Sequence, residues 1–250
     1  MNQEKRGISS RGLKNWGLLF MGMWIVSRVL TRILLGSSAG DALALKLESA
    51  SWMMPAAGLI LILEALSVCA VPVYTALLLE GIAHTADLKK YFLRTGLLAL
   101  ACEIPWNILS GGRVLDFRIQ NPLLGILICM LMAWFLNRYA DSGLGNLLVR
   151  ILVMTAAAAW CILMKVEYGL PLVLCTAVLW IFRKDRSKWG LAGMMGSALS
   201  ILLSPFFLAA PMGAILVNFY NGERGEGGRA VYYILFLLLL TSGALAAAFL

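Results

Sequence analysis

The only histidine of this chain lies four residues after a glutamate, within the stretch LLLEGIAHTADLKKYFLR. Side chains four positions apart lie on one face of a helix, so Glu80 and His84 can contact each other. A carboxylate at this distance would orient the imidazole, and histidine suits proton transfer near neutral pH. The pair therefore predicts a general base that takes a proton from a nucleophile.

His84 also permits a simpler interpretation, in which it ends a helix at the membrane interface and suits the helix dipole. Lys89, Lys90 and Arg94 follow within ten residues and favour the catalytic interpretation. A cationic surface beside the imidazole would bind a phosphorylated ligand or anionic lipid headgroups. Spacing alone leaves both interpretations open.

A third candidate catalytic residue, Glu103, lies nine positions after Arg94, which is about 13 Å along a helix and well inside a bilayer. Pro105 follows closely, and a proline kink there would free a carbonyl and widen a polar cavity. The alternative is an ion pair between Glu103 and an arginine of another span. We expect Glu80, His84 and Glu103 to line one cavity.

Other ionisable residues within apolar runs are few, because burying a charge in the bilayer costs roughly 2.5 to 3.5 kcal/mol. Arg28 and Arg150 are expected to extend their guanidinium groups to the membrane interface. Glu64 lies next to a segment whose register the sequence does not fix.

The elements that position these residues are expected to be membrane-spanning helices. The chain has 61% hydrophobic and 14% charged residues and a mean hydropathy of +0.84, which excludes a soluble protein. Apolar runs of about 17 to 25 residues each suffice to cross a bilayer as a helix. The sequence therefore predicts an all-α polytopic transmembrane helical bundle of about eight helices, as a single integral membrane domain over 1–250. The expected spans are 16–36, 53–83, 92–110, 122–138, 146–164, 168–182, 190–219 and 230–250.

Two of these spans, 53–83 and 190–219, contain two prolines each and exceed the length of one straight crossing. Each is expected to be a kinked helix or a re-entrant pair, because proline removes a backbone donor and clashes with the preceding turn. Splitting only one of them would change the side on which the chain ends.

The distribution of Lys and Arg predicts the orientation, because these residues concentrate in short cytoplasmic loops. With the N-terminus inside, twelve of them lie on the cytoplasmic side and seven on the opposite side, which favours both termini being cytoplasmic. The twelve are Lys5, Arg6, Arg11, Lys14, Lys89, Lys90, Arg94, Arg138, Arg183, Lys184, Arg186 and Lys188. The seven are Arg32, Lys46, Arg113, Arg118, Lys165, Arg224 and Arg229.

The cysteines lie within apolar runs, without CxxC spacing or histidine companions; they are Cys69, Cys102, Cys129, Cys161 and Cys175. This pattern supports neither a zinc site nor a disulfide framework, so no metal is expected. The net charge of +8 is spread over the membrane connectors and is explained by orientation. We therefore expect membrane lipid, and not nucleic acid, as a partner.

The stretch VPVYTALLLEGIAHTADLKKYFLRTGLLALACEIPWNIL resembles the TraX family of bacterial membrane proteins. The shared pattern is a proline–aromatic pair, E-G, H-T, a basic stretch, a tyrosine with an arginine three residues on, and E-I-P. VEYGLPLVL at 166–174 is similar to the family's acidic Y-G segment, and NFYNGERG at 218–225 is similar to its Y-N-G-K-R-G signature. LKNWGLLFM near the start is similar to the family's opening.

This resemblance implies an acyltransferase of the bacterial cytoplasmic (inner) membrane. The donor would be a cytoplasmic acyl-CoA such as acetyl-CoA. The acceptor would be an amine or hydroxyl of a membrane-associated peptide, such as a pilin-like subunit, or of a glycan. For such an enzyme we expect Glu80, His84 and Glu103 to be catalytic and Lys89, Lys90, Tyr91 and Arg94 to bind the donor. The family motifs also include Gly81, Thr85, Pro105, Tyr168, Gly169, Tyr220, Asn221, Gly222, Arg224 and Gly225.

The chain departs from the family pattern at two places. Family members carry an Asp-His pair in the first helix, where this sequence has Trp24 and Ile25, and the last helix lacks the family's aromatic-Pro-x-His-Leu segment. His84 alone would then have to be the base. The alternative to an acyltransferase is a catalytically degenerate relative that binds a lipid, a peptide or a partner helix. A transporter ranks third, because the sequence shows no inverted repeats.

Overall fold

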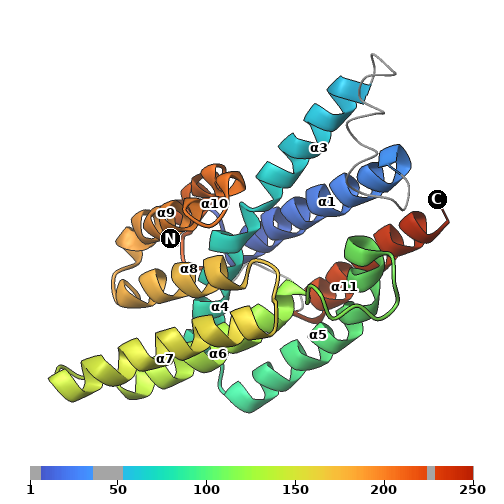
Figure 1. Cartoon of the computed structure of the whole chain (residues 1–250). Helices are drawn as coiled ribbons and strands as arrows, with labels where there is room; N and C mark the ends of the chain where they lie inside the picture. Colours follow the sequence, from blue (N-terminus) through green and yellow to red (C-terminus); the bar gives the residue numbers. More distant parts are fainter. Residues whose placement is uncertain (1–6, 36–52, 224–228, 250) are drawn as a thin grey trace.

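The computed structural model describes residues 7–35, 53–223 and 229–249, and every element named within them is a helix (Figure 1). The predicted all-α architecture is therefore confirmed. In chain order the α-helices are α1 (Ser10–Leu35), α3 (Met53–Ser67), α4 (Ala70–His84), α5 (Leu88–Gly111), α6 (Pro122–Arg138), α7 (Leu144–Leu163), α8 (Gly169–Ile181), α9 (Trp189–Ile201), α10 (Ala210–Asn218) and α11 (Arg229–Ala248). Two short 3-10 turns, η1 (Arg186–Lys188) and η2 (Pro205–Leu208), flank α9.

Five helical segments of the described chain are long and apolar enough to cross a membrane. They are α1, the pair α3 and α4 taken together, α5, α7 and α11, while α6, α8 and the segment Pro205–Asn218 are apolar but shorter. α7 illustrates a lipid-facing helix, because only its Ala157 and Cys161 are buried and Leu163 is 80% exposed. Helices satisfy their backbone groups internally, as a hydrocarbon environment requires. The chain is a multi-pass membrane protein.

The predicted span 53–83 is a bent crossing. α3 and α4 are joined by a turn in which the Val71 N–H donates to the Val68 carbonyl, three positions back. Pro72, in the first turn of α4, has no N–H to continue the regular pattern. Both halves pack against α1. Of the two predicted forms, the kinked helix is therefore the one adopted here.

The predicted span 190–219 is a pair of helices that returns to the end from which it came. α9 and α10 pack against each other, with η2 between them (Figure 1). Arg186, just before α9, and Tyr220, just after α10, both contact Glu80. Both ends of the pair therefore lie at the same end of the bundle, and this long span adopts the re-entrant form.

The expectation that both termini share one side needs correction, because α1 and α11 lie side by side and run in the same direction (Figure 1). Near their starts, the Tyr232 hydroxyl donates to Asn15 Oδ1 at 2.9 Å, and near their ends Arg32 Nη1 donates to the Ala247 carbonyl at 3.1 Å. The start of α1 and the end of α11 are thus at opposite ends of the bundle. The physical reason is that only one of the two long spans turns back.

One end of the bundle carries most of the described cations, and we call it the basic end. α1 and α5 start there, and the ends of α6 and α8 meet there through a hydrogen bond from Trp180 Nε1 to Asn137 Oδ1 of 2.8 Å. Its cations include Arg11, Lys14, Lys89, Lys90, Arg94, Arg138, Arg183, Lys184, Arg186 and Lys188. At the opposite end, the loops before α6 and α8 are joined by two backbone hydrogen bonds of Gln120.

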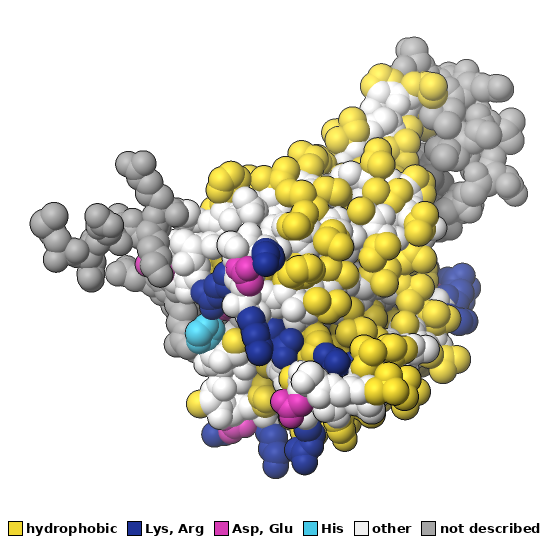
Figure 2. Space-filling model, turned by 90° about the vertical axis from the view of Figure 1, so that its left-hand side faces the viewer, with side chains coloured by type: hydrophobic (Ala, Val, Ile, Leu, Met, Phe, Trp, Pro, Cys, Tyr) yellow, Lys and Arg dark blue, Asp and Glu magenta, His cyan; other side chains and the backbone are white. Residues whose placement is uncertain are grey.

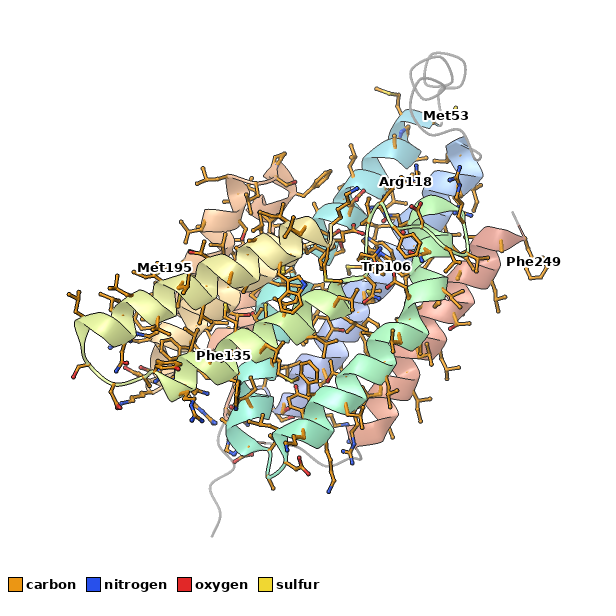
Figure 3. All side chains as sticks on the ribbon, turned by 60° about the horizontal axis from the view of Figure 1, so that its bottom comes forward. Met53, Trp106, Arg118, Phe135, Met195 and Phe249 are labelled. Carbon is orange, nitrogen blue, oxygen red and sulfur yellow. The ribbon has the colours of Figure 1, made fainter. Side chains whose placement is uncertain are left out.

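The buried apolar side chains form two clusters. The first surrounds α4, α6, α8 and α10 and includes Val73, Leu136 and Leu179. The second lies between α1, α5 and α11 and includes Trp24 and Trp106, whose rings stack with centroids 4.0 Å apart. Figure 3 shows Trp106 in the interior between these helices. The space between the two clusters is where the candidate site lies.

Candidate functional site

A cavity of about 640 Å³ lies between the two apolar clusters. Leu78 and Leu172 line it from the first cluster, and Trp24, Trp106 and Phe236 line it from the second. At the basic end its rim is polar and consists of Lys14, Glu80, His84, Thr85, Asp87, Lys90 and Arg94. Figure 2 shows this end of the molecule, where the histidine and several basic side chains gather beside an apolar flank.

Glu80 is the centre of the polar contacts at the rim. Its carboxylate is 10% exposed and lies on α4 one turn before the exposed end of that helix. Oε1 accepts a hydrogen bond from the Tyr220 hydroxyl at 2.9 Å, and Arg186 Nη2 donates to Oε1 and Oε2 at 2.9 and 2.8 Å. His84 Nε2 lies 3.0 Å from Oε1. The predicted Glu80–His84 contact is confirmed. Tyr220, Arg186 and His84 together hold the carboxylate in one position.

His84 has a partner for Nε2 in either protonation state of that nitrogen. With a proton on Nε2, the ring donates to Glu80 Oε1 at 3.0 Å, and the lone pair is then on Nδ1. Without that proton, Nε2 accepts from Arg186 Nη2 at 3.1 Å. The His84 side chain is 46% exposed and lines the cavity. The ring is therefore oriented by Glu80 and Arg186 while it faces the space in which a ligand would bind.

The segment after α10 explains how Arg186 reaches Glu80. Gly222 has φ +80°, which favours glycine, and a Cβ at this position would overlap the Arg186 guanidinium. Asn221 closes the turn by accepting from the Glu223 N–H at 2.9 Å, and its own N–H donates to the Ile8 carbonyl at 3.0 Å. Arg224 and Gly225, the last two residues of this motif, lie outside the described residues.

The cations predicted to bind the donor separate into two groups. Lys90 and Arg94 line the cavity, whereas Lys89 is exposed and does not line it. Asp87 caps α5 by accepting from the Lys90 N–H at 3.0 Å, and this hydrogen bond lowers the pKa of the Asp87 carboxyl. The Lys90 ammonium lies 3.3 Å from Asp87 Oδ2, so the rim carries an exposed ion pair at the start of α5, beside Arg94.

Three further predicted residues form one wall of the rim. Tyr91 lines the cavity and packs against Gly81, where an added Cβ would lie 2.7 Å from the Tyr91 hydroxyl and 2.9 Å from its ring. Thr85 ends α4 in an extended conformation and also lines the cavity. Gly81 is therefore required for the close approach of α4 and the Tyr91 ring.

Glu103 does not lie with Glu80 and His84, which corrects the expectation of one shared cavity. It does not line the cavity, and its Oε2 accepts a hydrogen bond from the side chain of Asn121, the residue that caps α6. Pro105 lies buried within α5, which continues without a break to Gly111. The contact joins α5 to α6, so Glu103 has a partner at another helix, as the alternative prediction expected. That partner is the Asn121 amide and not an arginine.

A family model described as "TraX protein" matches residues 39–242, well over half of the chain. The chain belongs to the TraX family. The TraX match includes Glu80, His84, Arg186 and Tyr220, so the whole polar cluster at the rim lies within it. The same comparisons found no match among curated proteins or solved structures.

The first helix of this TraX protein lies outside the matched residues, although it lines the cavity. LKNWGLLFM, the stretch similar to the family's opening, is part of α1. Trp24 and Ile25, which stand where the resemblance implies an Asp-His pair, are 2% and 5% exposed and belong to the second apolar cluster. Trp24 lines the cavity. The positions of the implied polar pair are therefore occupied by buried apolar residues, and Trp24 with the stacked Trp106 ring forms an apolar floor of the cavity.

Below that floor lies an ionic cluster that the sequence did not predict. Arg28 Nη2 contacts Glu64 Oε1 at 2.8 Å and Glu167 Oε1 at 3.4 Å, so Arg28 is paired within the bundle, contrary to the expected extension to the interface. A second cavity of about 410 Å³ adjoins this cluster and is lined by Glu64 and Glu167. Tyr168 lines both cavities and has φ 57°, and Gly169 packs against Cys161.

The most important site residue that sequence reasoning missed is Arg186. The sequence counted it only among the cations that set orientation, because 106 positions separate it from Glu80. Lys14 was counted in the same way, although it lines the cavity and its Nζ lies 5.1 Å from the centre of the Tyr232 ring. No local spacing links either cation to the Glu80–His84 pair, so only helix packing could reveal them.

Among the described residues no group of three or more His, Cys, Asp or Glu side chains could hold a metal ion. The five cysteines are buried free thiols. The ionisable groups at the rim are the His84 imidazole, the carboxylates of Glu80 and Asp87, and several cations.

Proposed function

We propose that this TraX-family protein is a membrane acyltransferase of the bacterial cytoplasmic membrane, with its basic end facing the cytoplasm. It would transfer an acyl group from acyl-CoA, such as acetyl-CoA, to an amine or hydroxyl of a membrane-associated acceptor such as a pilin-like peptide or a glycan. The observation that supports this is the Glu80–His84 pair, at 3.0 Å, on the rim of a cavity that Lys90 and Arg94 also line.

His84 acts as the general base of the reaction. Glu80 accepts from Nε2–H and holds the ring, so Nδ1 takes the proton of the acceptor as the bond from its nitrogen or oxygen to the acyl carbon forms. The bond from that carbon to the CoA sulfur breaks, and His84 returns the proton to the leaving thiolate. Positioning accounts for much of the rate, because a thioester is already activated.

The cations of the rim would hold the phosphates of the donor. Lys90, Arg94 and Lys14 come from two helices and surround the same opening. Cation–phosphate hydrogen bonds are strong and orient the ligand. The polar rim binds the charged part of the donor, and the thioester then lies at the level of His84.

The decisive experiment uses the protein in lipid nanodiscs with acetyl-CoA and a peptide that carries an N-terminal amine, and it measures release of the CoA thiol. We expect His84→Ala to lower the rate at least 100-fold while acetyl-CoA binding, measured by calorimetric titration, is retained. Lys89→Ala is the control, because Lys89 does not line the cavity. Transfer by His84→Ala at the parental rate would show that the mechanism is wrong.

A second candidate function is a non-catalytic binding protein, and the apolar pair Trp24 and Ile25 is the observation that favours it. Such a protein would retain the scaffold and use the cavity to bind a lipid, a peptide or a partner helix. Calorimetric titration separates the two functions. Absence of acetyl-CoA binding at millimolar concentration would favour the non-catalytic protein.

A further inference from the structure

The part of the cavity beyond the rim is mostly apolar and deep. Its walls come from α1, α4, α5, α6, α8 and α11, and we call it the deep part. Its apolar lining is Met21, Trp24, Leu98, Trp106, Leu123 and Phe236, and the Tyr74 ring lies edge-on to Phe236. Arg94 on the rim and Trp106 in the deep part are twelve positions apart on α5, which is about 18 Å along the helix axis. Lys14 and Trp24 are ten positions apart on α1, about 15 Å.

The position of the base decides which part of a donor can occupy this space. If His84 takes the proton of the acceptor, the thioester must lie beside it at the rim. The phosphates of the donor are held by cations of the same rim, so the CoA part of the donor extends toward the basic end. The acyl chain is the part of the donor that extends from the thioester in the other direction. An acetyl group would leave the deep part without contact to the donor.

We propose that the deep part binds the acyl chain of the donor and that the preferred chain is linear and longer than acetyl. This proposal rests on the proposed acyltransferase function. The floor formed by the stacked Trp24 and Trp106 rings, which are 2% and 1% exposed, sets the limit of chain length. Trp24, one of the two apolar residues that replace the implied Asp-His pair, then has a function of its own, because it lines the chain-binding surface.

Chain length should control affinity in a stepwise manner. Each methylene group transferred from water into the apolar deep part is expected to strengthen binding about fourfold. The gain stops when the chain reaches the floor. Saturated chains from acetyl to decanoyl cover this range in steps of two methylene groups.

The test measures binding of acetyl-, butanoyl-, hexanoyl-, octanoyl- and decanoyl-CoA to the protein in nanodiscs, with empty nanodiscs subtracted. Leu98→Trp adds bulk to the deep part, and Leu97→Trp is the matched control, because Leu97 is the preceding residue of α5 and is 58% exposed. We expect affinity to rise with chain length in the parent and in Leu97→Trp. In Leu98→Trp the rise should stop at a shorter chain than in Leu97→Trp.

Four outcomes would overturn the proposal, and they can be told apart by what each removes. Equal affinity for acetyl-CoA and octanoyl-CoA, or equal behaviour of the two tryptophan variants, removes the chain site but leaves the acyltransferase function intact. Absence of binding by every CoA thioester removes the acyltransferase function itself. Binding of decylamine that depends on Leu98, without any dependence on donor chain length, assigns the deep part to the acceptor.

Discussion

Arg186 donates from Nη2 to both carboxylate oxygens of Glu80, at 2.9 and 2.8 Å, although the two residues are 106 positions apart. The contact joins the end of α4 to the turn before α9. Glu80 also accepts from Tyr220, just after α10, so one carboxylate links both ends of the re-entrant pair to the crossing helix. His84 lies 3.0 Å from the same carboxylate and is oriented by this link.

Replacement of Arg186 by leucine should destabilise the protein by about 1 to 3 kcal/mol, because a mostly buried carboxylate loses its cation. The effect falls below the usual range for buried pairs because the Arg186 side chain is 43% exposed. The measurement is thermal unfolding, followed by reaction of the five buried cysteines with a thiol-reactive dye. Glu80→Gln combined with Arg186→Leu should restore part of the loss. An unchanged unfolding temperature in Arg186→Leu would show that the ion pair does not stabilise the fold.

Gly222→Ala should disturb the site through Arg186. The substitution places a Cβ in the space of the guanidinium at a φ of +80°, with a strain cost of about 1 to 3 kcal/mol. Because Arg186 then loses its contact with Glu80, we expect acyl transfer to slow at least tenfold. Gly58→Ala is the matched control, since an added Cβ at Gly58 meets no atom within 4 Å. Equal rates for the two variants would exclude a role for the turn in positioning Arg186.

Lys90 and Lys89 are adjacent cations with different predicted roles. Lys90→Ala should weaken acetyl-CoA binding by up to about fivefold, because an exposed ion pair contributes about 0.2 to 1 kcal/mol. Lys89→Ala should leave the dissociation constant unchanged, since this side chain does not line the cavity. Titration at two salt concentrations checks the electrostatic origin, because the difference between the variants should shrink at high salt. Identical losses for the two variants would place the donor's phosphates elsewhere.

Arg28→Met should lower stability because Glu64 and Glu167 lose the guanidinium they share. Burial raises the pKa of Glu167, in the loop before α8, to about 7, and Arg28 acts in the opposite direction. A carboxyl whose pKa is raised on folding stabilises the fold below its ordinary pKa of 4.5, and this contribution is lost as the pH rises through about 7. The loss in Arg28→Met should therefore be larger at pH 8 than at pH 5, as measured by thermal unfolding. A loss that does not change with pH would show that Glu167 does not bind a proton in the variant.

The direction of α11 gives a topology prediction. A reporter placed before Ser10 and one placed after Ala248 should lie on opposite sides of the membrane, because α1 and α11 run in the same direction. A reporter in the loop between α6 and α7, at 139–143, should share the side of the first reporter. Accessibility to a membrane-impermeant reagent measures all three. The same side for the first two reporters would contradict the parallel arrangement of α1 and α11.

The sequence could predict the helices and the Glu80–His84 contact, since both depend on residues that are close along the chain. Apolar runs of sufficient length form helices in a membrane whatever surrounds them. Glu80 and His84 meet because four positions make about one turn of a helix. Proline positions in 53–83 and 190–219 indicated that both spans are irregular, but a proline is compatible with a kink and with a re-entrant turn.

The same reasoning failed where a residue's surroundings depend on another helix. Glu103 was assigned to the cavity from its depth, but the rotation of α5 directs it to Asn121 and away from Glu80. Arg28 was assigned to the interface, but α3 and the loop before α8 supply two carboxylates within the bundle. Depth along a helix follows from counting residues, whereas the direction of a side chain around the helix axis has meaning only relative to neighbouring helices.

The sequence by itself determined that this chain is a multi-pass helical membrane protein of the TraX type with an imidazole–carboxylate pair at its basic end. The tertiary structure decided that Arg186 and Tyr220 hold that pair, that the span 190–219 turns back, and that an apolar space adjoins the site. The physical reason is range: hydrophobic runs and one helical turn involve neighbouring residues, while these contacts arise only when helices far apart in the chain pack together.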